Sequence, residues 1–331
     1  MIRTAGWNQI MQIILGRTRQ QVVHLNPPFT IIQPDTMLRD LVRGLNPLAG
    51  RRFYTAVYEE HGRVVAYVQT RCRWQRRDEW TVTTLGSMVP ESDDLWAMLL
   101  EEVIGQAGAH GIVRVFAKLA ADDPRQAVFH QLGFSQFTRE EIWGNLYFKN
   151  PQGSRPDRGV LRHQEDRDAW DLLQLYRAVT PRGVQQAEAP TSKQWQLGGG
   201  RPGGLTAQAY VWEADNAQAR ADGTQSSGLG GWVRLLTGPK GHWITLLYRP
   251  EQRALCAEAL HYILWSARTS APKPIYIALR EYQSEMGQAL ADNGFHLLSE
   301  QALLVKYTAV LARRTVPRLL LQREHSLVVS D

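Results

Sequence analysis

The sequence predicts one α/β (α+β) fold that occurs twice along the chain. A strand, a long helix, a second strand and a short helix ending in Gly-Phe occupy residues 80–134 and again residues 241–295. The two Gly-Phe pairs begin at Gly133 and Gly294, which are 294 − 133 = 161 positions apart, and this shift fits roughly fifty residues without gaps. A period of this length far exceeds a solenoid unit, so each copy is the size of a domain.

The chain length agrees with two domains. At 331 residues the chain exceeds what one hydrophobic core usually supports, and 44% hydrophobic residues can fill two cores. Asn150 to Pro156 has the composition of a linker. We therefore expect a first domain over residues 1–150, a linker over 151–156, a second domain over 157–313 and a C-terminal tail over 314–331.

In the first half, two apolar runs at 53–58 and 64–68 flank a His-Gly turn and predict a β-hairpin. A third strand follows near 80–88. A helix then begins after the N-cap signal at Ser92, with its apolar side at 95–104, and ends at Gly108 to Gly111. A strand at 113–116, a short helix after Pro124 and a closing strand at 141–148 complete this half.

The second half begins with a helix over 166–179, followed by strands near 205–211 and 231–236 that lead into the repeated block. The glycine-rich stretch 198–204 between them lacks the Gly-Lys-Ser/Thr ending of a phosphate-binding loop. We interpret it as an ordinary loop.

The most specific pieces of the repeat are Phe129 to Phe134 and Leu290 to Phe295. With the order of elements around them, they resemble the GCN5-related N-acetyltransferase (GNAT) superfamily over most of the chain. The resemblance implies a tandem acyl-CoA N-acyltransferase fold, with a mixed, mostly antiparallel sheet flanked by helices in each half. Two-domain members in which one half is catalytic and the other structural exist, and this chain looks like that arrangement.

In the family, a glycine-containing turn before the long helix binds the pyrophosphate of acetyl-CoA with its backbone amides. In the first half this turn holds three carboxylates, Glu91, Asp93 and Asp94, and no glycine. One carboxylate about 4 Å from a phosphate costs about 4 kcal/mol at an effective dielectric constant of about 20. We therefore expect the first half to bind coenzyme A poorly.

The second half keeps part of the turn. Arg253 stands at the family's basic position, while Cys256 and Glu258 replace glycines. The helical wheel predicts Cys256 in the core and Glu258 toward solvent. The resemblance then implies that acetyl-CoA contacts five residues: Leu247, Tyr248, Arg253, Ala254 and Cys256.

The candidate catalytic residues are His242 and Tyr282. Counting back six residues from Tyr248 puts His242 at the family's base position, although a histidine at a strand start is also an ordinary edge residue. The tyrosine that serves as the family's acid is replaced by Phe129 and Leu290, and Tyr282 is a geometric substitute or a surface loop residue.

Composition limits the partners. Two cysteines at non-equivalent places indicate free thiols, and no stretch resembles a signal peptide or a membrane span, so we expect a cytoplasmic protein without a membrane partner. The net charge of +6 is scattered, with one basic run at Arg71 to Arg77 that holds Trp74. That run suits either single-stranded nucleic acid or, as we prefer, a solvated hairpin tip.

These observations predict an acetyltransferase that uses acetyl-CoA and a small-molecule or peptide amine, as a monomer or homodimer, with the chemistry in the second half. The first half would be a structural or acceptor-shaping partner. One alternative is a GNAT-like ligand- or partner-binding protein without catalysis. A further alternative is an acyl transferase of the same fold that depends on aminoacyl-tRNA, for which salt-sensitive RNA binding is expected.

Overall fold

The computed structural model describes residues 1–16, 21–25, 32, 36–45, 52–73, 76–90, 92–148, 156–157, 159–196, 205–214, 228–268 and 272–308. The expected linker, apart from Pro156, the glycine-rich stretch 198–204, Trp74 and the expected tail lie outside these residues. Among the described residues, no helix is both long and apolar enough to cross a membrane.

The first half contains seven strands and four helices in the described part of the chain: β1 (Ile2–Thr4), α1 (Trp7–Leu15), β2 (Gln21–His24), α3 (Thr36–Gly44), β3 (Phe53–Glu60), β4 (Arg63–Arg73), β5 (Arg76–Ser87), α4 (Asp93–Ala109), β6 (Arg114–Ala120), α5 (Gln126–Gln131) and β7 (Ser135–Asn145).

The second half has a similar order, with short 3₁₀ helices added and no described strand in the place of β2. Its elements are β8 (Arg162–His163), the 3₁₀ helix η2 (Asp166–Asp168), α6 (Ala169–Val179), α7 (Arg182–Glu188), η3 (Ser192–Trp195), β9 (Thr206–Glu213), β10 (Leu229–Thr237), β11 (His242–Tyr248), η5 (Pro250–Gln252), α9 (Arg253–Ser266), β12 (Ile275–Arg280), η6 (Glu281–Met286), α10 (Gly287–Asp292) and β13 (His296–Tyr307).

All the described strands belong to one mixed sheet. Its order is β1-β3-β4-β5-β6-β13-β7-β12-β11-β10-β9-β8, with β2 on β5, and only the β5–β6 and β11–β12 pairs are parallel. The predicted α/β fold with a mixed, mostly antiparallel sheet is therefore confirmed.

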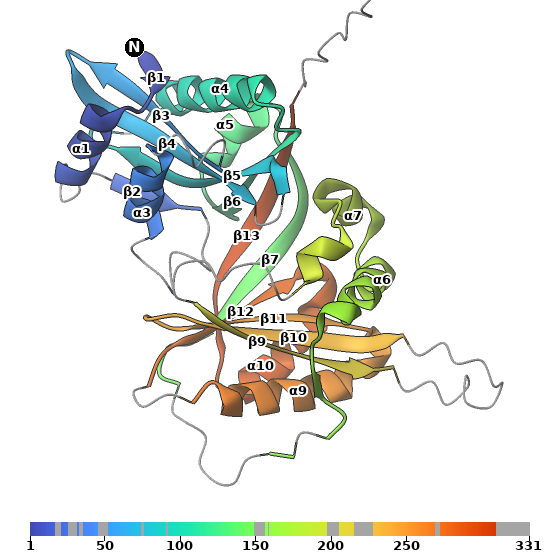
Figure 1. The fold of residues 1–331 in the computed structure, drawn as a ribbon. Coiled ribbons are helices and arrows are strands. Elements are labelled where there is room, and N and C mark those ends of the chain that lie inside the picture. Colours follow the sequence, from blue (N-terminus) through green and yellow to red (C-terminus); the bar gives the residue numbers. More distant parts are fainter. Residues whose placement is uncertain are drawn as a thin grey trace, which may run out of the picture.

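Helices cover both faces of the sheet in each half (Figure 1). In the first half α4 and α5 bury one core, and α1 and α3 pack on the opposite face. In the second half α9 and α10 bury a second core, and α6 packs on the opposite face. Two cores in one chain agree with the argument from length.

The two halves exchange their last strands. β13 lies between β6 and β7, and β7 pairs on its other side with β12 (Figure 1). The register is symmetric, because Ser135 pairs with Val305 while Gly144 pairs with His296, each partner standing 161 positions from the other pair's member. The two halves are therefore consecutive in the sequence, but in the sheet each half contains the last strand of the other.

This local symmetry places Glu140 opposite its own counterpart, Gln301. The pair resembles the contact at the axis of an isologous dimer, where one residue meets its own copy. Here one member is a carboxylate and the other a neutral amide, and Glu140 pairs with Lys118 and Arg280.

The structure confirms the predicted hairpin turn. His61 and Gly62 have φ of 49° and 77°, the left-handed region that two-residue hairpin turns require. The elements before β3 were not predicted from the sequence. Ile10 and Ile13 form the buried side of α1.

Candidate functional site

Each half contains a point where two parallel strands separate. The β5–β6 pairing covers only Glu79 to Thr81 on β5, and the β11–β12 pairing ends at Thr245 and Ala278. Beyond these points the inner edges of β5 and β11 lose their parallel neighbours. We refer to these edges, residues 82–87 and 246–248, as the first and second open edges.

The first open edge is occupied by the chain itself. β2 pairs with β5 in antiparallel register from Gln21 opposite Ser87 to His24 opposite Thr84. The backbone N–H of Leu25 then donates to the Thr83 carbonyl at 2.9 Å. Backbone hydrogen bonds therefore already satisfy this edge.

At the second open edge, side chains from η6 approach β11. The Gln283 amide donates to the Leu246 carbonyl at 3.4 Å, and the Tyr248 hydroxyl donates to Glu285 at 3.1 Å. The backbone N–H of Arg249 donates to the Gly230 carbonyl, on the β10 side of β11. Because successive residues of a strand direct their backbone groups to opposite sides, the N–H and C=O of Tyr248 face the side where β12 no longer pairs.

The helices that follow the open edges begin differently. In α4 the Ser92 hydroxyl caps the N–H of Leu95 at 3.2 Å, and Asp93 and Asp94 stand in the first turn. In α9 the N-cap Gln252 makes no capping side-chain bond, and the first turn has no acidic residue. The positive end of the α9 dipole therefore remains available to an anion, whereas that of α4 is already compensated.

The expected cofactor contacts fall into two groups. Arg253 and Ala254 are exposed at the start of α9. Leu247 and Tyr248 are buried on β11, at the second open edge.

Cys256 lies with neither group. It is fully buried in the second core, as the helical wheel predicted, and burial raises the pKa of its thiol. Its amide is the fourth after the N-cap and is used within the helix. Cys256 therefore presents no group to a ligand, and Glu258 is exposed as predicted.

His242 lies at the start of β11, four residues before Leu246 and so roughly 13 Å away along the strand. The imidazole is 1% exposed, with Nδ1 2.9 Å from the Thr237 hydroxyl. Burial, with a smaller effect of Lys273, lowers its pKa to about 4. His242 is thus neutral at pH 7 and does not border the second open edge.

Tyr282 follows β12 directly and adjoins the central ion-pair cluster, which we define as Lys118, Glu140, Glu188 and Arg280. Arg280 donates to Glu188 at 2.8 Å and lies 3.5 Å from Glu140, which also pairs with Lys118. Burial raises the pKa of Tyr282, although Arg280 opposes this. Tyr282 is therefore a protonated hydroxyl at neutral pH.

The central ion-pair cluster joins the two halves. Its members come from β6 and β7 on one side and from α7 and β12 on the other. Tyr176 of α6 also donates to Glu188 at 2.8 Å. Burial alone raises the pKa of Glu188, but Arg280, Arg73 and the Tyr176 hydroxyl more than offset it, so the pKa lies below its usual range.

The basic run at the β4–β5 hairpin has a structural role in the described residues. Glu79 is fully buried between Arg73, Arg76 and Arg114, at 3.4, 2.9 and 2.9 Å. Arg76 also donates to the Ala189 carbonyl beyond α7. Arg73 and Arg76 therefore make ion pairs and hydrogen bonds within the protein. This favours a hairpin tip over a nucleic-acid site, because a phosphate would have to compete with these contacts.

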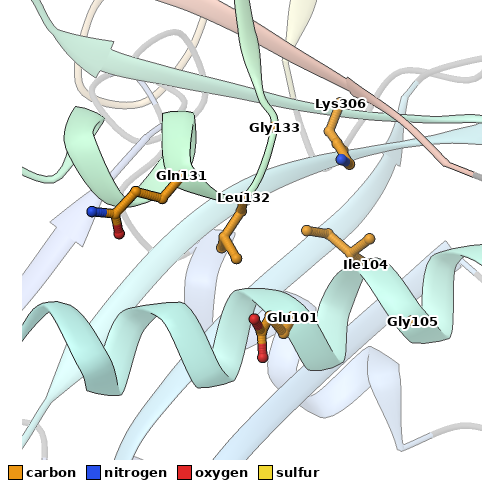
Figure 2. A pocket seen from close by; sticks show the side chains of 7 residues that line it. All are labelled: Glu101, Ile104, Gly105, Gln131, Leu132, Gly133 and Lys306. Carbon is orange, nitrogen blue, oxygen red and sulfur yellow. The ribbon is translucent and has the colours of Figure 1, made fainter.

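An open pocket of about 510 Å³ lies in the first half between α4, the end of α5 and β13 (Figure 2). Lys306 of β13 points into it above Leu132 and Gly133, and Ile104 and Glu101 of α4 line the other side. The pocket adjoins neither open edge, and we assign no chemistry to it.

No protein-family model and no curated protein matches the chain. Solved structures do. A tandem GNAT protein from the clavulanic acid biosynthesis pathway, solved without acetyl-CoA, superposes with a TM-score of 0.51 at 14% identity, over 93% of this chain and 98% of that one. A GCN5-related N-acetyltransferase from Sphaerobacter thermophilus gives a TM-score of 0.49 at 13% identity, over 87% and 96%.

Identities this low show the fold alone, and the likeness is greater for the first of these two structures. The superposition extends over both halves of the chain, and so over both copies of the repeated order of elements. The chain therefore has the fold of the tandem GCN5-related N-acetyltransferases.

Proposed function

We propose that the protein is an acyltransferase of the N-acetyltransferase type, which moves an acetyl group from acetyl-CoA to a small-molecule or peptide amine in its second half. The observation that carries the proposal is the difference between the two open edges. The first is closed by a backbone strand and followed by a capped helix start with two acidic residues. At the second, no backbone strand among the described residues takes the place of β12, and the first turn of α9 is uncapped and has no acidic residue, although Glu251 stands in η5 just before it.

In this proposal the pyrophosphate of acetyl-CoA lies at the start of α9. The guanidinium of Arg253 and the uncapped first-turn amides of Ala254 and Leu255 are the groups that suit it. The pantetheine arm runs along the second open edge at Tyr248, with Leu247 behind it. Cys256 is left out, because neither its side chain nor its amide is available.

Acetyl-CoA supplies the activated acyl group as a thioester when bound. Tyr282 is the candidate proton donor for the departing thiolate, since its hydroxyl stays protonated at neutral pH. His242 is not assigned as a direct base, because it lies about 13 Å along the strand from Leu246. The first half has a structural role that includes the central ion-pair cluster.

The test is calorimetric titration with acetyl-CoA of the full chain, Arg253→Glu and the control Arg268→Glu. The control makes the same charge change just beyond the other end of α9. We expect one site per chain, at least tenfold weaker in Arg253→Glu and unchanged in Arg268→Glu. Equal weakening in both variants would contradict a site at the start of α9. Release of coenzyme A thiol with a panel of amines then tests the transfer.

One observation favours a second candidate, a ligand-binding protein without catalysis. Gln283 already donates to the Leu246 carbonyl, so a side chain of the protein occupies part of the second open edge. No heat and no thermal stabilisation at saturating acetyl-CoA would favour this function over acyl transfer.

A further inference from the structure

Arg234 of the second half has no carboxylate partner among the described residues. Arg234 lies on β10 and pairs in register with Thr245, which in turn pairs with Ala278 of β12. Its neighbour two residues back, Trp232, packs against α6. Because residues two apart in a strand share a face, Arg234 stands on the α6 face of the sheet.

The Arg234 guanidinium is poorly compensated. Its Nε is buried without a hydrogen-bond partner, and within the described residues no carboxylate pairs with it. Its one described contact is the Trp232 ring, 5.3 Å from the guanidinium carbon. Burial lowers the pKa of the group, and no neighbouring acid opposes this effect in the part of the chain that is described.

The surroundings of Arg234 remain partly open. On the same face lie its register partner Thr245, the partner of Thr245 on β12, Ala278, and Leu236 two residues further along β10. Each keeps part of its exposure although all three strands are internal. We call these four residues, Arg234 included, the open strip. The apolar cluster under α6 lies on one side of it, and on the other side Leu236 and Ala278 pack against a second cluster around Trp243 and Tyr276.

Arg280, on the same face, differs in its charge balance. It also has a buried nitrogen without a partner, Nη1, but Glu140 and Glu188 neutralise its charge. Arg234 is therefore the position on this face where a negative charge is missing. Arg234 keeps part of its exposure, and of its three guanidinium nitrogens Nε is the one buried without a partner. A half-buried cation without a counter-charge suits a ligand that supplies the negative charge.

We propose that the open strip binds a small ligand through a carboxylate or phosphate group, held by the Arg234 guanidinium with the Thr245 hydroxyl beside it. The planar fork of arginine suits these two oxyanions because two N–H groups can meet two oxygens. The inference does not depend on acyl transfer. If the proposed transfer is correct, the anionic group belongs to the acceptor.

The test uses inorganic phosphate and glutarate as probes, without acetyl-CoA, by thermal unfolding and calorimetry. All variants are made in an Arg253→Glu background, which removes anion binding at the start of α9. We expect one of the two probes to bind and to raise the Tm, and its identity distinguishes a phosphate from a carboxylate ligand. Arg234→Met should weaken that binding ten- to a hundredfold.

The same variant separates a ligand site from a structural role. Removing a half-buried cation that lacks a counter-charge should leave the Tm without anion unchanged or higher, whereas loss of a structural arginine lowers it. The matched control is Arg268→Met, because Arg268 lies 5.1 Å from the Trp265 ring and is exposed. It should bind the probe as well as the parent does.

Three results would overturn the proposal: no binding of either probe, unchanged binding in Arg234→Met, or equal loss in Arg268→Met. If Arg234→Met does not fold, Arg234→Lys keeps the charge and removes the fork. It should fold and still bind the probe at least severalfold more weakly.

Discussion

At the first open edge a backbone strand lies along β5, whereas at the second a single side-chain amide reaches β11. The first edge is closed by a four-residue register that cannot open without unpairing β2. In the described residues, the second has one hydrogen bond of 3.4 Å from the Gln283 amide, and in the proposed function a ligand displaces it. The two copies of the fold therefore differ at equivalent strand edges: a strand pairs with β5, and a side-chain hydrogen bond reaches β11.

The largest effect is expected where the copies meet, at Glu140 and its counterpart Gln301. Glu140→Gln leaves Lys118 and Arg280 without their shared carboxylate, and removal of one partner from a buried ion pair costs roughly 3–5 kcal/mol. Chemical denaturation should show this fall in the free energy of unfolding.

The control exploits the local symmetry. In Glu140→Gln combined with Gln301→Glu, the carboxylate returns on the neighbouring strand β13, directly opposite its original position. The double variant should recover a substantial part of the lost stability. No recovery would show that the ion pairs need the carboxylate on β7, and that a carboxylate at the paired position on β13 cannot replace it.

The second effect concerns His242, whose counterpart by the 161-residue shift is Thr81. The folded state holds the pKa of His242 at about 4, below the ordinary 6.5. The unfolded chain therefore binds a proton below pH 6.5 that the folded chain refuses until about pH 4. The contribution of neutral His242 to the free energy of unfolding is therefore fully present above pH 6.5. It is lost as the pH falls from 6.5 to 4, by about 3 kcal/mol.

Unfolding titrations of the protein and of His242→Asn at several pH values measure this difference. The variant should lose less stability than the parent between pH 6.5 and pH 4. Parallel pH profiles would contradict a depressed pKa. Unchanged coenzyme A release by the variant would also agree with leaving His242 out of the chemistry.

A third, smaller effect tests the closure of the second open edge. Gln283→Ala removes the bond to the Leu246 carbonyl, whose net value is about 1 kcal/mol. We expect acetyl-CoA affinity, measured by calorimetry, to rise about fivefold. Val23→Ala on β2 is the control in the first half and should create no second site. A weaker affinity in Gln283→Ala would mean that Gln283 holds the cofactor instead of competing with it.

The smallest effect compares the two helix starts. Ser92→Ala removes the cap of α4 and should lower the free energy of unfolding by about 1 kcal/mol, while Gln252→Ala at α9 should change it little. Thermal unfolding measures both. Similar losses would show that Gln252 caps α9 after all and would weaken the case for an anion there.

Much of the fold followed from local patterns. The β3–β4 hairpin, α4, α9 and the core position of Cys256 were predicted from apolar periodicity and turn residues, which act over a few neighbours. The acidic start of α4 also followed from the sequence, since Asp93 and Asp94 occur beside the N-cap Ser92. The closing strand was placed at 141–148, but β7 begins at Ser135, directly after the Gly133 turn.

The candidate site was less accessible to sequence reasoning. Arg253 and Tyr248 came from the family pattern, but Gln283 and Arg234 stand in no motif. An arginine in an apolar strand, as in Trp232 to Leu236, was the one available signal for the open strip. Whether such a residue has a counter-charge depends on strands and helices that are distant in sequence.

The sequence by itself determined that one α+β fold occurs twice, because the Gly-Phe turns and the helix periodicity are local and survive in both copies. Only the tertiary structure decided that β7 and β13 exchange places and that β2 lies on the first open edge. Strand partners are chosen by hydrogen bonds between segments far apart in sequence. A strand's own residues specify that it needs a partner and leave open which partner it finds.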